Sequence, residues 1–402
     1  MSGIKQGVIL CGGLGTRLGK ITKKIPKPMV VVSGKPFLEH LLIQLKKNGI
    51  KKVLLLVGYK SEVIKRYFGD GKKLNIKISY SFLPKEFETG SRILKAKNML
   101  DKKFILLYSD NYSSLNISKL NYKFSELKKE ILFSLVKKEN GNCNFNIKKN
   151  LVKYQNKRSK NKKYVEIGYM VISRTVLKKL TRNDTNFSKF LAKMSKLKLT
   201  GGIVNKHGYT SIGDLKRLKY TRRLFSNNNY LLVDRDGVLN VSPKKRYVTT
   251  PSELKINKKF CDKLPKDSNL LCITNQAGLS TKDVTLQNLK KINKFIKNYL
   301  KQKQIFIKEF FVSDHHYNSK SFYRKPKPGL FFKASQKYRF ILDKTFYIGD
   351  DKRDIEAAYN ANTFIVYVGK NLLTKKEKVK YKFTILDKKI KSLYNEKIQF
   401  NF

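Results

Sequence analysis

Two aspartates stand one residue apart at the end of an apolar run, in residues 231–240, which read LLVDRDGVLN. The run is typical of a buried strand, so Asp234 and Asp236 follow its carboxyl end, where doubly wound α/β folds bind their ligands. One carboxylate can attack phosphorus while the other protonates the leaving oxygen and later activates water. A magnesium ion must then offset the repulsion between these acids and a phosphate. The spacing favours phosphoryl transfer, with a solvated turn as the alternative reading of a bare acid pair.

Three further motifs follow in order: CITNQAG, YRKPKPG and YIGDDKRDIEAA. Together with DRDGVLN they resemble the haloacid dehalogenase phosphatases, over about residues 229–368. The first three motifs are most similar to the branch that contains heptose bisphosphate phosphatase and histidinol phosphatase. The insert between the first two motifs is short, so the resemblance implies a doubly wound parallel sheet without a large cap.

The resemblance assigns a role to each motif. It makes Asp234 the nucleophile and Asp236 the general acid and base, with both residues on Mg²⁺, Asp236 through its backbone carbonyl. The other implied roles are phosphoryl binding by Thr274 and Asn275, charge neutralisation by Lys325, substrate contact by Arg324, metal binding by Asp350 and bracing of Lys325 by Asp354.

Zinc is not expected, although relatives in the heptose branch commonly carry a zinc loop before the RKPKPG motif. Here Ser313, Ser321 and Tyr323 stand at the cysteine positions, so only His315 remains of four ligands. Structural zinc needs about four nitrogen or sulfur ligands. We expect packing of Phe322 and Tyr323 to hold this loop instead.

The first half of the chain opens with glycines after a short apolar run, in LCGGLGTRLGKITKKIPKPM. Bare backbone N–H groups at Gly12, Gly13 and Gly15 can surround phosphates, which Arg17 and Lys27 would neutralise. The spacing is neither that of a P-loop nor G-x-G-x-x-G opening a helix directly. A tight strand-to-helix turn is the alternative reading of the glycines alone.

The longer string L-x-G-G-x-G-T-R-L, followed by PKPM and GKPFLEH, resembles the sugar-1-phosphate nucleotidyltransferases over about residues 4–220. The resemblance implies a Rossmann-like domain with a mixed sheet. A sugar 1-phosphate oxygen would attack the α-phosphorus of a nucleoside triphosphate and release pyrophosphate, with Mg²⁺ as cofactor. The nucleotide-binding roles fall on Gly12, Gly13, Gly15, Arg17 and Lys27.

Other segments match the nucleotide and sugar contacts of that family. FETGSRI matches a base- and sugar-contacting segment through Thr89 and Gly90, but Ser91 and Arg92 stand where small residues are usual. The remaining matches are Lys157 for the sugar phosphate, and Glu166 and Gly168 for the sugar pocket.

Metal binding in this half is implied for Asp110, in LLYSDNY. The second metal aspartate of the family usually stands in D-I-G-T-P, whereas this chain has Ser211 at that position and Asp214 three residues later. Either Asp214 reaches the ion, or Asp110 carries it with water and phosphate.

The charge and the cysteines limit the function classes. Lys and Arg number 88 against 29 Asp and Glu, a formal charge of +59. The lysines are spread through the whole chain, which disfavours the alternative of a nucleic-acid-binding protein with degenerate catalytic domains. The positive charge would still attract anionic substrates. Four scattered cysteines and the lack of a long apolar run predict a cytoplasmic protein without a membrane span.

The alternation of strand and helix patterns favours two α/β domains in this chain of 402 residues. Residues 36–50 have the leucine spacing of a helix that ends at Gly49. The polar SNNNY segment interrupts the pattern. We therefore place the domain boundary at this segment. With the two family resemblances, it gives a nucleotidyltransferase domain over 1–226, a phosphatase domain over 229–370 and a C-terminal extension over 371–402.

Two activities on one chain suggest consecutive steps on small-molecule substrates. The phosphatase would remove the 7-phosphate of D-glycero-D-manno-heptose 1,7-bisphosphate, and the transferase would activate the remaining 1-phosphate for a surface polysaccharide, with GTP as the preferred donor. The alternative keeps both folds but changes the substrate to histidinol phosphate or another sugar phosphate.

Overall fold

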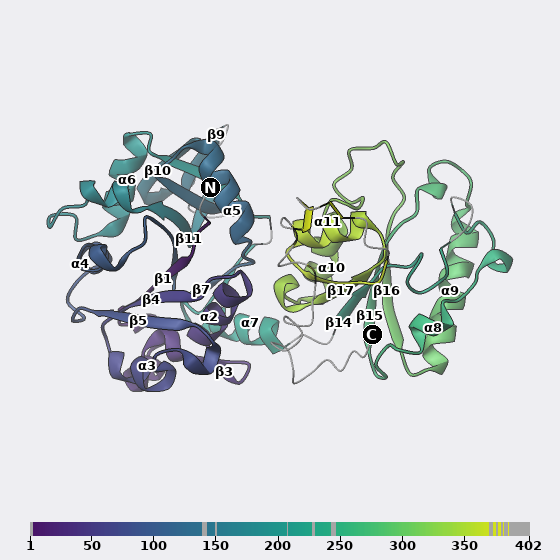
Figure 1. Cartoon of the computed structure of the whole chain (residues 1–402), viewed down its shortest axis with the longest axis horizontal. Coiled ribbons are helices and arrows are strands. Elements are labelled where there is room, and N and C mark those ends of the chain that lie inside the picture. Colours follow the sequence, from purple (N-terminus) through teal and green to yellow (C-terminus); the bar gives the residue numbers. More distant parts are fainter. Residues whose placement is uncertain are drawn as a thin grey trace. The chain divides into compact units, whose positions relative to one another are not determined.

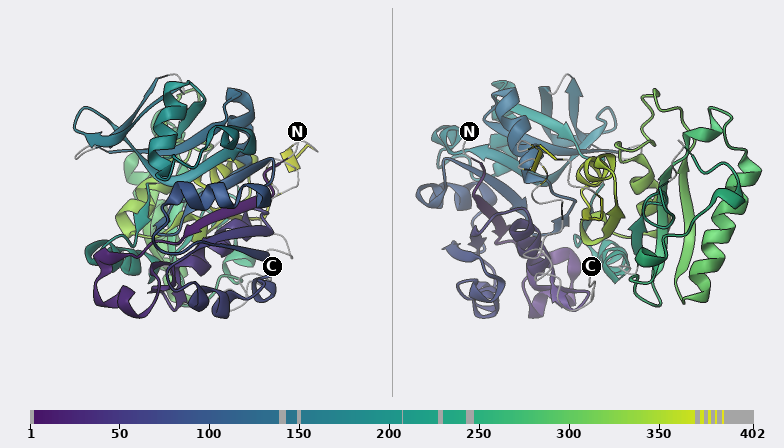
Figure 2. Two further views of the ribbon diagram at one scale, coloured as in Figure 1. Left: turned by 90° about the vertical axis from the view of Figure 1, so that its left-hand side faces the viewer. Right: turned by 45° about the vertical axis from the view of Figure 1, so that its right-hand side comes forward.

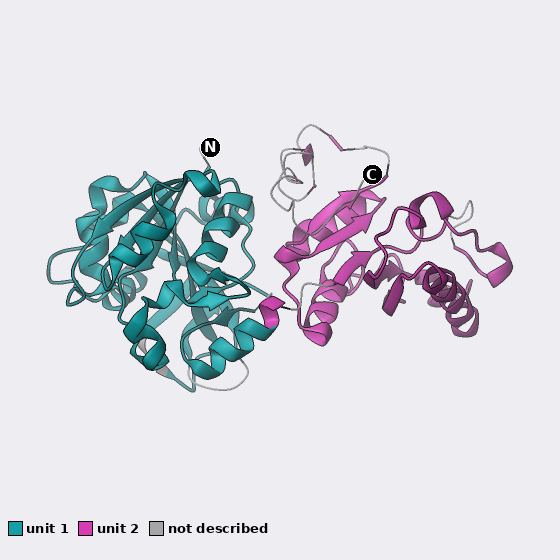
Figure 3. Ribbon diagram, turned by 90° about the horizontal axis from the view of Figure 1, so that it is seen from below, with its two compact units in different colours: residues 1–223 teal, residues 224–402 magenta. Residues whose placement is uncertain are grey.

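The computed structural model describes residues 3–138, 143–148, 151–206, 208–226, 230–242 and 247–369, with 373–374, 377–378, 381 and 385. The contacts within the chain divide it into two compact units, Met1–Arg223 and Leu224–Phe402 (Figure 3). Each unit has a sheet and a core of its own.

Unit 1 contains a nine-stranded mixed sheet in the order β5-β4-β1-β6-β11-β8-β12-β10-β9. Strands β5, β4, β1 and β6 are parallel, and β11 is antiparallel to β6 and β8. This arrangement confirms the mixed sheet predicted for the first domain. Two short pairs, β2 with β3 and β7 with β13, lie outside this sheet. The strands of unit 1 are β1 (Gln6–Cys11), β2 (Val31–Val32), β3 (Lys35–Pro36), β4 (Lys52–Val57), β5 (Lys77–Phe82), β6 (Lys103–Tyr108), β7 (Asn111–Tyr112), β8 (Ile131–Lys137), β9 (Cys143–Lys148), β10 (Leu151–Ser159), β11 (Tyr164–Ser173), β12 (Thr200–Val204) and β13 (Thr210–Ser211).

Helices pack against both faces of this sheet, because alternate residues of a strand point to opposite faces. Val8 and Leu10 share a core with α4 and α6, whereas a Cβ at Gly7 would lie 2.7 Å from Leu45 of α2. The helix predicted over 36–50 is α2. The helices are α1 (Lys20–Lys24), α2 (Phe37–Lys47), α3 (Ser61–Phe68), α4 (Thr89–Lys95), α5 (Ile117–Leu127), α6 (Phe187–Lys196) and α7 (Leu215–Ser226), with short 3₁₀ turns η1 (Thr16–Leu18), η2 (Lys27–Met29), η3 (Lys72–Leu74), η4 (Lys97–Met99) and η5 (Arg174–Lys179).

Unit 2 contains a five-stranded parallel sheet in the order β16-β15-β14-β17-β18. Its central strand, β14, is the apolar run that precedes the two aspartates of DRDGVLN. The strands are β14 (Tyr230–Val233), β15 (Asn269–Asn275), β16 (Phe306–Ser313), β17 (Phe346–Gly349) and β18 (Phe364–Tyr367).

Two separate apolar cores lie on the two faces of this parallel sheet. Leu231 and Val233 pack with α8 and α9, whereas Leu232 between them packs with α10 and α11. Figures 1 and 2 show one helix pair on each side of the strands. The helices are α8 (Lys258–Cys261), α9 (Leu286–Gln302), α10 (Gly329–Tyr338) and α11 (Lys352–Ala361), with 3₁₀ turns η6 (Pro251–Glu253), η7 (Ala277–Leu279) and η8 (Leu342–Lys344).

The parallel strands bring distant motifs to one edge of each sheet. In unit 2 the carboxyl ends of β14, β15 and β17 are neighbours, and each carries a predicted site motif. In unit 1 the ends of β1 and β6 are neighbours in the same way. Among the described helices, every one is too short or too polar to cross a lipid bilayer.

Candidate active sites

The glycine loop of unit 1 begins directly after β1 and folds back onto the segment that carries Lys27. Gly15 has a φ of +69°, and a Cβ there would lie 2.9 Å from the Cβ of Lys27. A side chain at this position would therefore strain the backbone and collide with its neighbour. Gly13 has open space around it, which leaves room for a ligand against the backbone.

Lys27, at the start of η2, forms an ion pair with Asp110, which follows β6. The Nζ of Lys27 lies 2.5 Å from Oδ2 of Asp110, and both side chains are largely buried. The backbone carbonyl of Asp110 accepts from the N–H of Ile212, which ties β7 to the segment before α7. A predicted phosphate-binding lysine and a predicted metal-binding aspartate are thus brought together.

Arg92 lies beneath the glycine loop and is 4% exposed. Its guanidinium donates to the carbonyls of Val57 at 2.9 Å, Leu83 at 2.5 Å and Pro84 at 2.6 Å. A Cβ at Gly12 would lie 2.4 Å from Cζ of Arg92. The large residue in place of the usual small one therefore supports the loop from below, a role that the motif alone did not reveal.

The other predicted sugar and nucleotide residues have local structural roles as well. The N–H of Gly90 donates to the Thr185 carbonyl at 2.7 Å, and a Cβ at Gly90 would lie 2.0 Å from the Asp184 carbonyl oxygen. Thr89 begins α4. Gly168, with a φ of +75°, allows the ring of Tyr108 to approach, since a Cβ there would lie 2.6 Å from Cγ of Tyr108.

Four further predicted residues of unit 1 lie apart from this contact network or beyond what is described. Burial, followed by the neighbouring Glu166 carboxylate, raises the pKa of Tyr108, so Glu166 faces the end of β6. Asp214 accepts from the N–H of Arg217 at 2.9 Å and pairs with its guanidinium at 3.3 Å, which caps α7. Arg17 is exposed, and the side chain of Lys157 lies outside the described residues.

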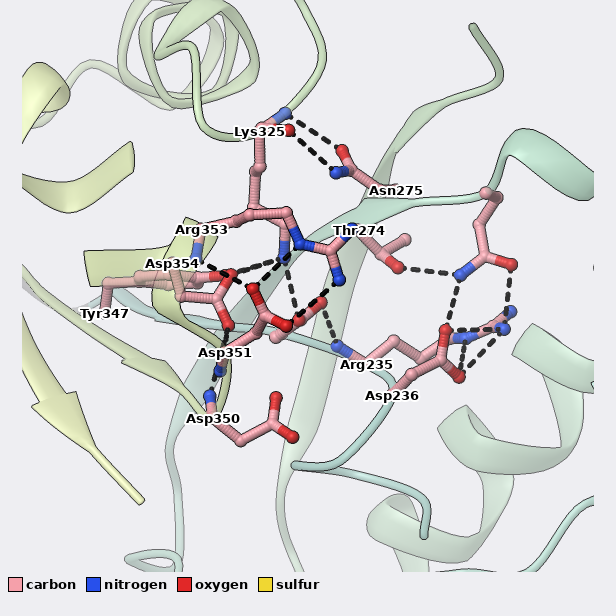
Figure 4. A network of polar contacts seen from close by, with 12 residues as sticks. Arg235, Asp236, Thr274, Asn275, Lys325, Tyr347, Asp350, Asp351, Arg353 and Asp354 are labelled. Carbon is pink, nitrogen blue, oxygen red and sulfur yellow. Dashed lines mark hydrogen bonds and ion pairs between the residues drawn. The ribbon is translucent and has the colours of Figure 1, made fainter. Parts of the chain in front are cut away.

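Four motifs of unit 2 meet at the carboxyl edge of its sheet (Figure 4). Nζ of Lys325 lies 2.8 Å from Oδ2 of Asp234, 2.8 Å from Oδ1 of Asp354 and 2.9 Å from the hydroxyl of Tyr347. Burial acts to lower the pKa of Lys325, but the two aspartates outweigh it and the pKa is raised. The ammonium therefore stays charged where a phosphoryl group would need it.

Asp354 is a bracing residue whose two oxygens are both occupied. Oδ1 accepts from the hydroxyl of Tyr347 at 2.8 Å, and Oδ2 accepts from the N–H groups of Asp350 and Asp351 at 3.1 Å each. Asp351 and Asp354 form a capping box at the start of α11, so a common helix-capping device also orients Lys325.

Asn275 lies beside Lys325 and is hydrogen-bonded to its backbone. Its side-chain Nδ2 donates to the carbonyl of Lys325 at 3.1 Å, and its Oδ1 accepts from the N–H of Lys325 at 3.0 Å. This amide holds the lysine backbone and also lines the cavity described below, so its contact with a phosphoryl group stays a prediction.

Asp236 is held by donors on both of its carboxylate oxygens. Oδ1 accepts from Arg235 at 3.0 Å and from Asn240 at 3.0 Å, and Oδ2 accepts from Gln276 at 2.8 Å. Burial acts to raise the pKa of Asp236, but Arg235 and these hydrogen bonds outweigh it and the pKa is lowered. The ionised form, which can accept a proton from water, is thus favoured.

Carboxylate oxygens of Asp234, Asp350 and Asp354 lie within 4.8 Å of one another. Burial, followed by the charge of Asp354, raises the pKa of Asp350 to about 6, and burial raises that of Asp234 well above its usual value. A divalent cation would restore both to their ionised forms. The oxygen donors suit Mg²⁺, and because Asp354 is already engaged, Asp234 and Asp350 are the residues that fit it.

Gly237 leaves room for the carboxylate of Asp350 beside the loop that carries Asp234 and Asp236. Gly237 has a φ of +81°, and a Cβ there would lie 1.8 Å from Oδ2 of Asp350. Any side chain would displace the Asp350 carboxylate from the loop that follows β14.

A cavity of about 290 Å³ opens onto these groups. Thr274 and Arg324, which were predicted to contact the phosphoryl group and the substrate, line it, and Arg353 lines it as well. Arg353 donates to Asp351 through Nε at 2.8 Å and Nη2 at 3.1 Å. The residues that line the cavity are Asp234, Asp236, Ser242, Tyr247, Thr274, Asn275, Tyr317, Arg324, Lys325, Asp350, Asp351, Arg353 and Asp354.

Sequence reasoning missed Arg235, Gln276, Tyr347 and Arg353. Each stands next to, or within three residues of, a recognised motif position, which was the only available signal. Arg235 in particular is fully buried, and nothing in its charge predicts that.

The loop before the RKPKPG motif packs only in part as predicted. Phe322 contacts Phe332 of α10, with ring centroids 5.8 Å apart. Tyr323, which was also expected to pack on the domain, is 45% exposed. The side chain of Ser313 is buried at the end of β16, and His315 lies beside the ring of Tyr323.

Comparison with known families agrees with this division of the chain. Residues 6–202 match the family model for nucleotidyl transferases, and residues 232–401 match the model for polynucleotide kinase 3 phosphatases. The chain therefore joins a nucleotidyltransferase-type unit to a phosphatase-type unit.

Two curated relatives of the first unit carry the same description, D-glycero-alpha-D-manno-heptose 1-phosphate guanylyltransferase. The Campylobacter jejuni protein is 46% identical over 122 residues, 30% of this chain and 55% of the relative. The Aneurinibacillus thermoaerophilus protein is 33% identical over 131 residues, 32% of this chain and 56% of the relative. The chain thus spans about half the length of these relatives.

A solved structure of the D,D-heptose 1,7-bisphosphate phosphatase of B. bronchiseptica, with magnesium and phosphate, is similar to part of this chain. The match has 24% identity and a TM-score of 0.33, and it covers 35% of this chain and 79% of that one.

Proposed function

We propose that the chain is a bifunctional enzyme of nucleotide-activated heptose synthesis. The haloacid dehalogenase-like unit 2 removes the 7-phosphate of D-glycero-D-manno-heptose 1,7-bisphosphate. Unit 1 then transfers a guanylyl group from GTP to the sugar 1-phosphate and releases pyrophosphate. The sugar and the base are suggested by the two guanylyltransferases that resemble unit 1.

The observation that carries the phosphatase half is the cluster of Lys325 with Asp234 and Asp354 at the sheet edge. The negative charge of the bound phosphate opposes the lowered pKa of Asp236 and favours its protonated form. An Asp234 oxygen attacks phosphorus, the bond from phosphorus to the sugar oxygen breaks, and the protonated Asp236 supplies the proton that this oxygen takes. Water then cleaves the aspartyl phosphate and gives its proton to Asp236, which restores both residues. Mg²⁺ held by Asp234, Asp350 and the Asp236 carbonyl would supply the charge neutralisation that these acids and the phosphate require.

The cavity also offers cations for a second phosphate. Arg324 and Arg353 line the same space as Lys325, so one phosphoryl group can lie at Lys325 while the arginines meet another. This arrangement favours a bisphosphate over a monophosphate.

In unit 1, Lys27 and Arg17 would neutralise the triphosphate above the glycine loop, and Thr89 and Gly90 would contact the nucleotide. Lys157, Glu166 and Gly168 would form the sugar side of the site. Asp110, with Asp214 as a weaker candidate, would hold Mg²⁺ there. No protein nucleophile is needed, because the sugar phosphate oxygen attacks directly, so positioning and charge carry the reaction.

The test is to incubate the purified protein with heptose 1,7-bisphosphate and each nucleoside triphosphate in turn. Phosphate and pyrophosphate release are followed separately. We expect phosphate release with every nucleotide and pyrophosphate release chiefly with GTP. Release of phosphate from histidinol phosphate, but not from the heptose, would overturn the assigned substrate.

A further inference from the structure

Arg235 has the largest fully buried side chain of the described residues, although it lies between two aspartates of a polar motif. Its guanidinium reaches Asp236 through Nε at 3.2 Å and Nη2 at 3.0 Å, and Nη2 also donates to Oε1 of Gln276 at 2.8 Å. Apolar residues of similar volume often replace a buried ion pair without loss of stability. Stability alone therefore gives no reason for an arginine at this position.

Arg235 also decides which way the Gln276 amide faces. A guanidinium can only donate, so the oxygen of Gln276 must point toward it and the amide nitrogen must point away. That nitrogen donates to Oδ2 of Asp236 at 2.8 Å and to Oγ1 of Thr274 at 2.9 Å. Because Thr274 accepts this bond, its own hydrogen is directed to another acceptor, and Thr274 lines the cavity.

These side chains come from the ends of two neighbouring strands, β14 and β15. Figure 4 shows this for Arg235 and Asp236 after β14 and for Thr274 at the end of β15. Gln276 is 2% exposed, so water does not compete effectively for its hydrogen bonds. Asn240, fully buried, adds a further donor to Asp236 at 3.0 Å. The carboxylate of Asp236 is thus held from several sides.

We propose that Arg235 and Gln276 are positioning residues of the phosphatase reaction, which fix the carboxylate of Asp236 and the hydroxyl of Thr274. The inference rests on the proposed phosphatase function and goes beyond it. Gln276 acts through its amide donor, so its chemistry matters more than its volume. The proton transfer to the leaving oxygen depends on this placement, whereas the attack by Asp234 does not.

The test compares two leaving groups in single turnovers with the enzyme in excess. The leaving oxygen of heptose 1,7-bisphosphate becomes a sugar hydroxyl and needs a proton, whereas p-nitrophenyl phosphate releases p-nitrophenolate, a stabilised anion that needs none. General acid catalysis is worth about 10² to 10⁴ in rate, so loss of its positioning should cost about tenfold or more for the sugar phosphate. The rate with the aryl phosphate should change less than about threefold. The apparent affinities for the two substrates should fall together, because the Thr274 hydroxyl contacts the phosphoryl group that they share.

Gln276→Met keeps the volume but removes the amide, and Gln276→Glu keeps the pairing with Arg235 but removes the donor. Both should lower the ratio of the sugar phosphate rate to the aryl phosphate rate. Gln287→Met is the matched control, because Gln287 is exposed on α9 and should leave the ratio unchanged. Thermal unfolding of each variant verifies that it folds. Arg235 itself is left intact, because removal of one partner of a buried ion pair, unlike replacement of the whole pair, leaves the other charge unpaired and endangers folding.

An equal fall in both rates, or no change in either, would overturn the positioning role. A wild-type protein that releases phosphate from neither substrate would overturn the proposed phosphatase function and this inference with it. A normal wild type with unaffected Gln276 variants would overturn this inference alone.

Discussion

The guanidinium of Arg92 fills the space where a side chain at Gly12 would lie, with 2.4 Å between a Cβ at Gly12 and Cζ of the arginine. The pair joins the end of β1 to α4, because Arg92 donates at the same time to the carbonyls of Val57 and Leu83. The glycine loop of unit 1 therefore depends on a buried cation that is hydrogen-bonded to backbone oxygens.

Gly12→Ala should destabilise unit 1 by about 1–3 kcal/mol, the usual cost of overpacking a filled site. Gly13→Ala is the matched control, since a Cβ at Gly13 meets no atom within 4 Å. Thermal unfolding measures both changes. If the two alanines cost the same, the contact with Arg92 is not the cause. In an Arg92→Ala background the extra cost of Gly12→Ala should disappear, as expected of residues in direct contact.

The two activities should be separable by single substitutions. Asp234→Asn should abolish phosphate release, because an amide is not a nucleophile, and should leave nucleotidyl transfer to a ready-made sugar 1-phosphate nearly intact. Asp110→Ala should do the reverse. Separate assays of phosphate and pyrophosphate check both. Loss of both activities in either variant, with folding preserved, would contradict the independence of the two units.

Lys325→Met should lower the phosphatase kcat by roughly 10² or more, by analogy with the loss of one charge-stabilising donor. The lysine is 4% exposed and contacts two aspartates, so its removal also leaves buried charges unpaired. Lys333→Met, on the exposed side of α10, is the control and should change kcat less than about threefold. A near-normal kcat in Lys325→Met would assign the lysine a purely structural role.

Magnesium should stabilise unit 2 more at about pH 7.5 than at about pH 5. The pKa of Asp350 is raised to about 6, so the folded state holds this proton more tightly than the unfolded chain does. Without metal, stability from this group is therefore lost as the pH rises from about 4 through 6. Mg²⁺ binds the ionised carboxylate of Asp350, which predominates at about pH 7.5 and not at about pH 5. Magnesium binding therefore restores the lost stability of the folded state only at the higher pH.

Melting temperatures with and without Mg²⁺ at the two pH values measure this effect. Asp350→Asn should reduce the magnesium response at both. A larger magnesium shift at the lower pH would contradict the assignment of Asp350 as a ligand.

The alternation of strand and helix patterns was sufficient to predict parallel strands in unit 2 and the place of Asp234 at the end of the first of them. The reason is physical, because apolar runs bury as strands and parallel strands share one carboxyl edge. In unit 1 the same reasoning predicted the loop of Gly12, Gly13 and Gly15 after β1, and the place of Asp110 after β6. The site roles of Thr274 and Asp350 came instead from the resemblance of their motifs to a known family.

Side-chain partners were decided only by the tertiary structure. Asn275 binds the backbone of Lys325, and Arg235 is buried against Asp236, although both residues are polar and stand in recognised motifs. Gly90 is required by the carbonyl of Asp184, which is distant in sequence. A hydrogen bond or close approach of this kind depends on which segments lie side by side, and the type and spacing of residues in one motif do not specify that.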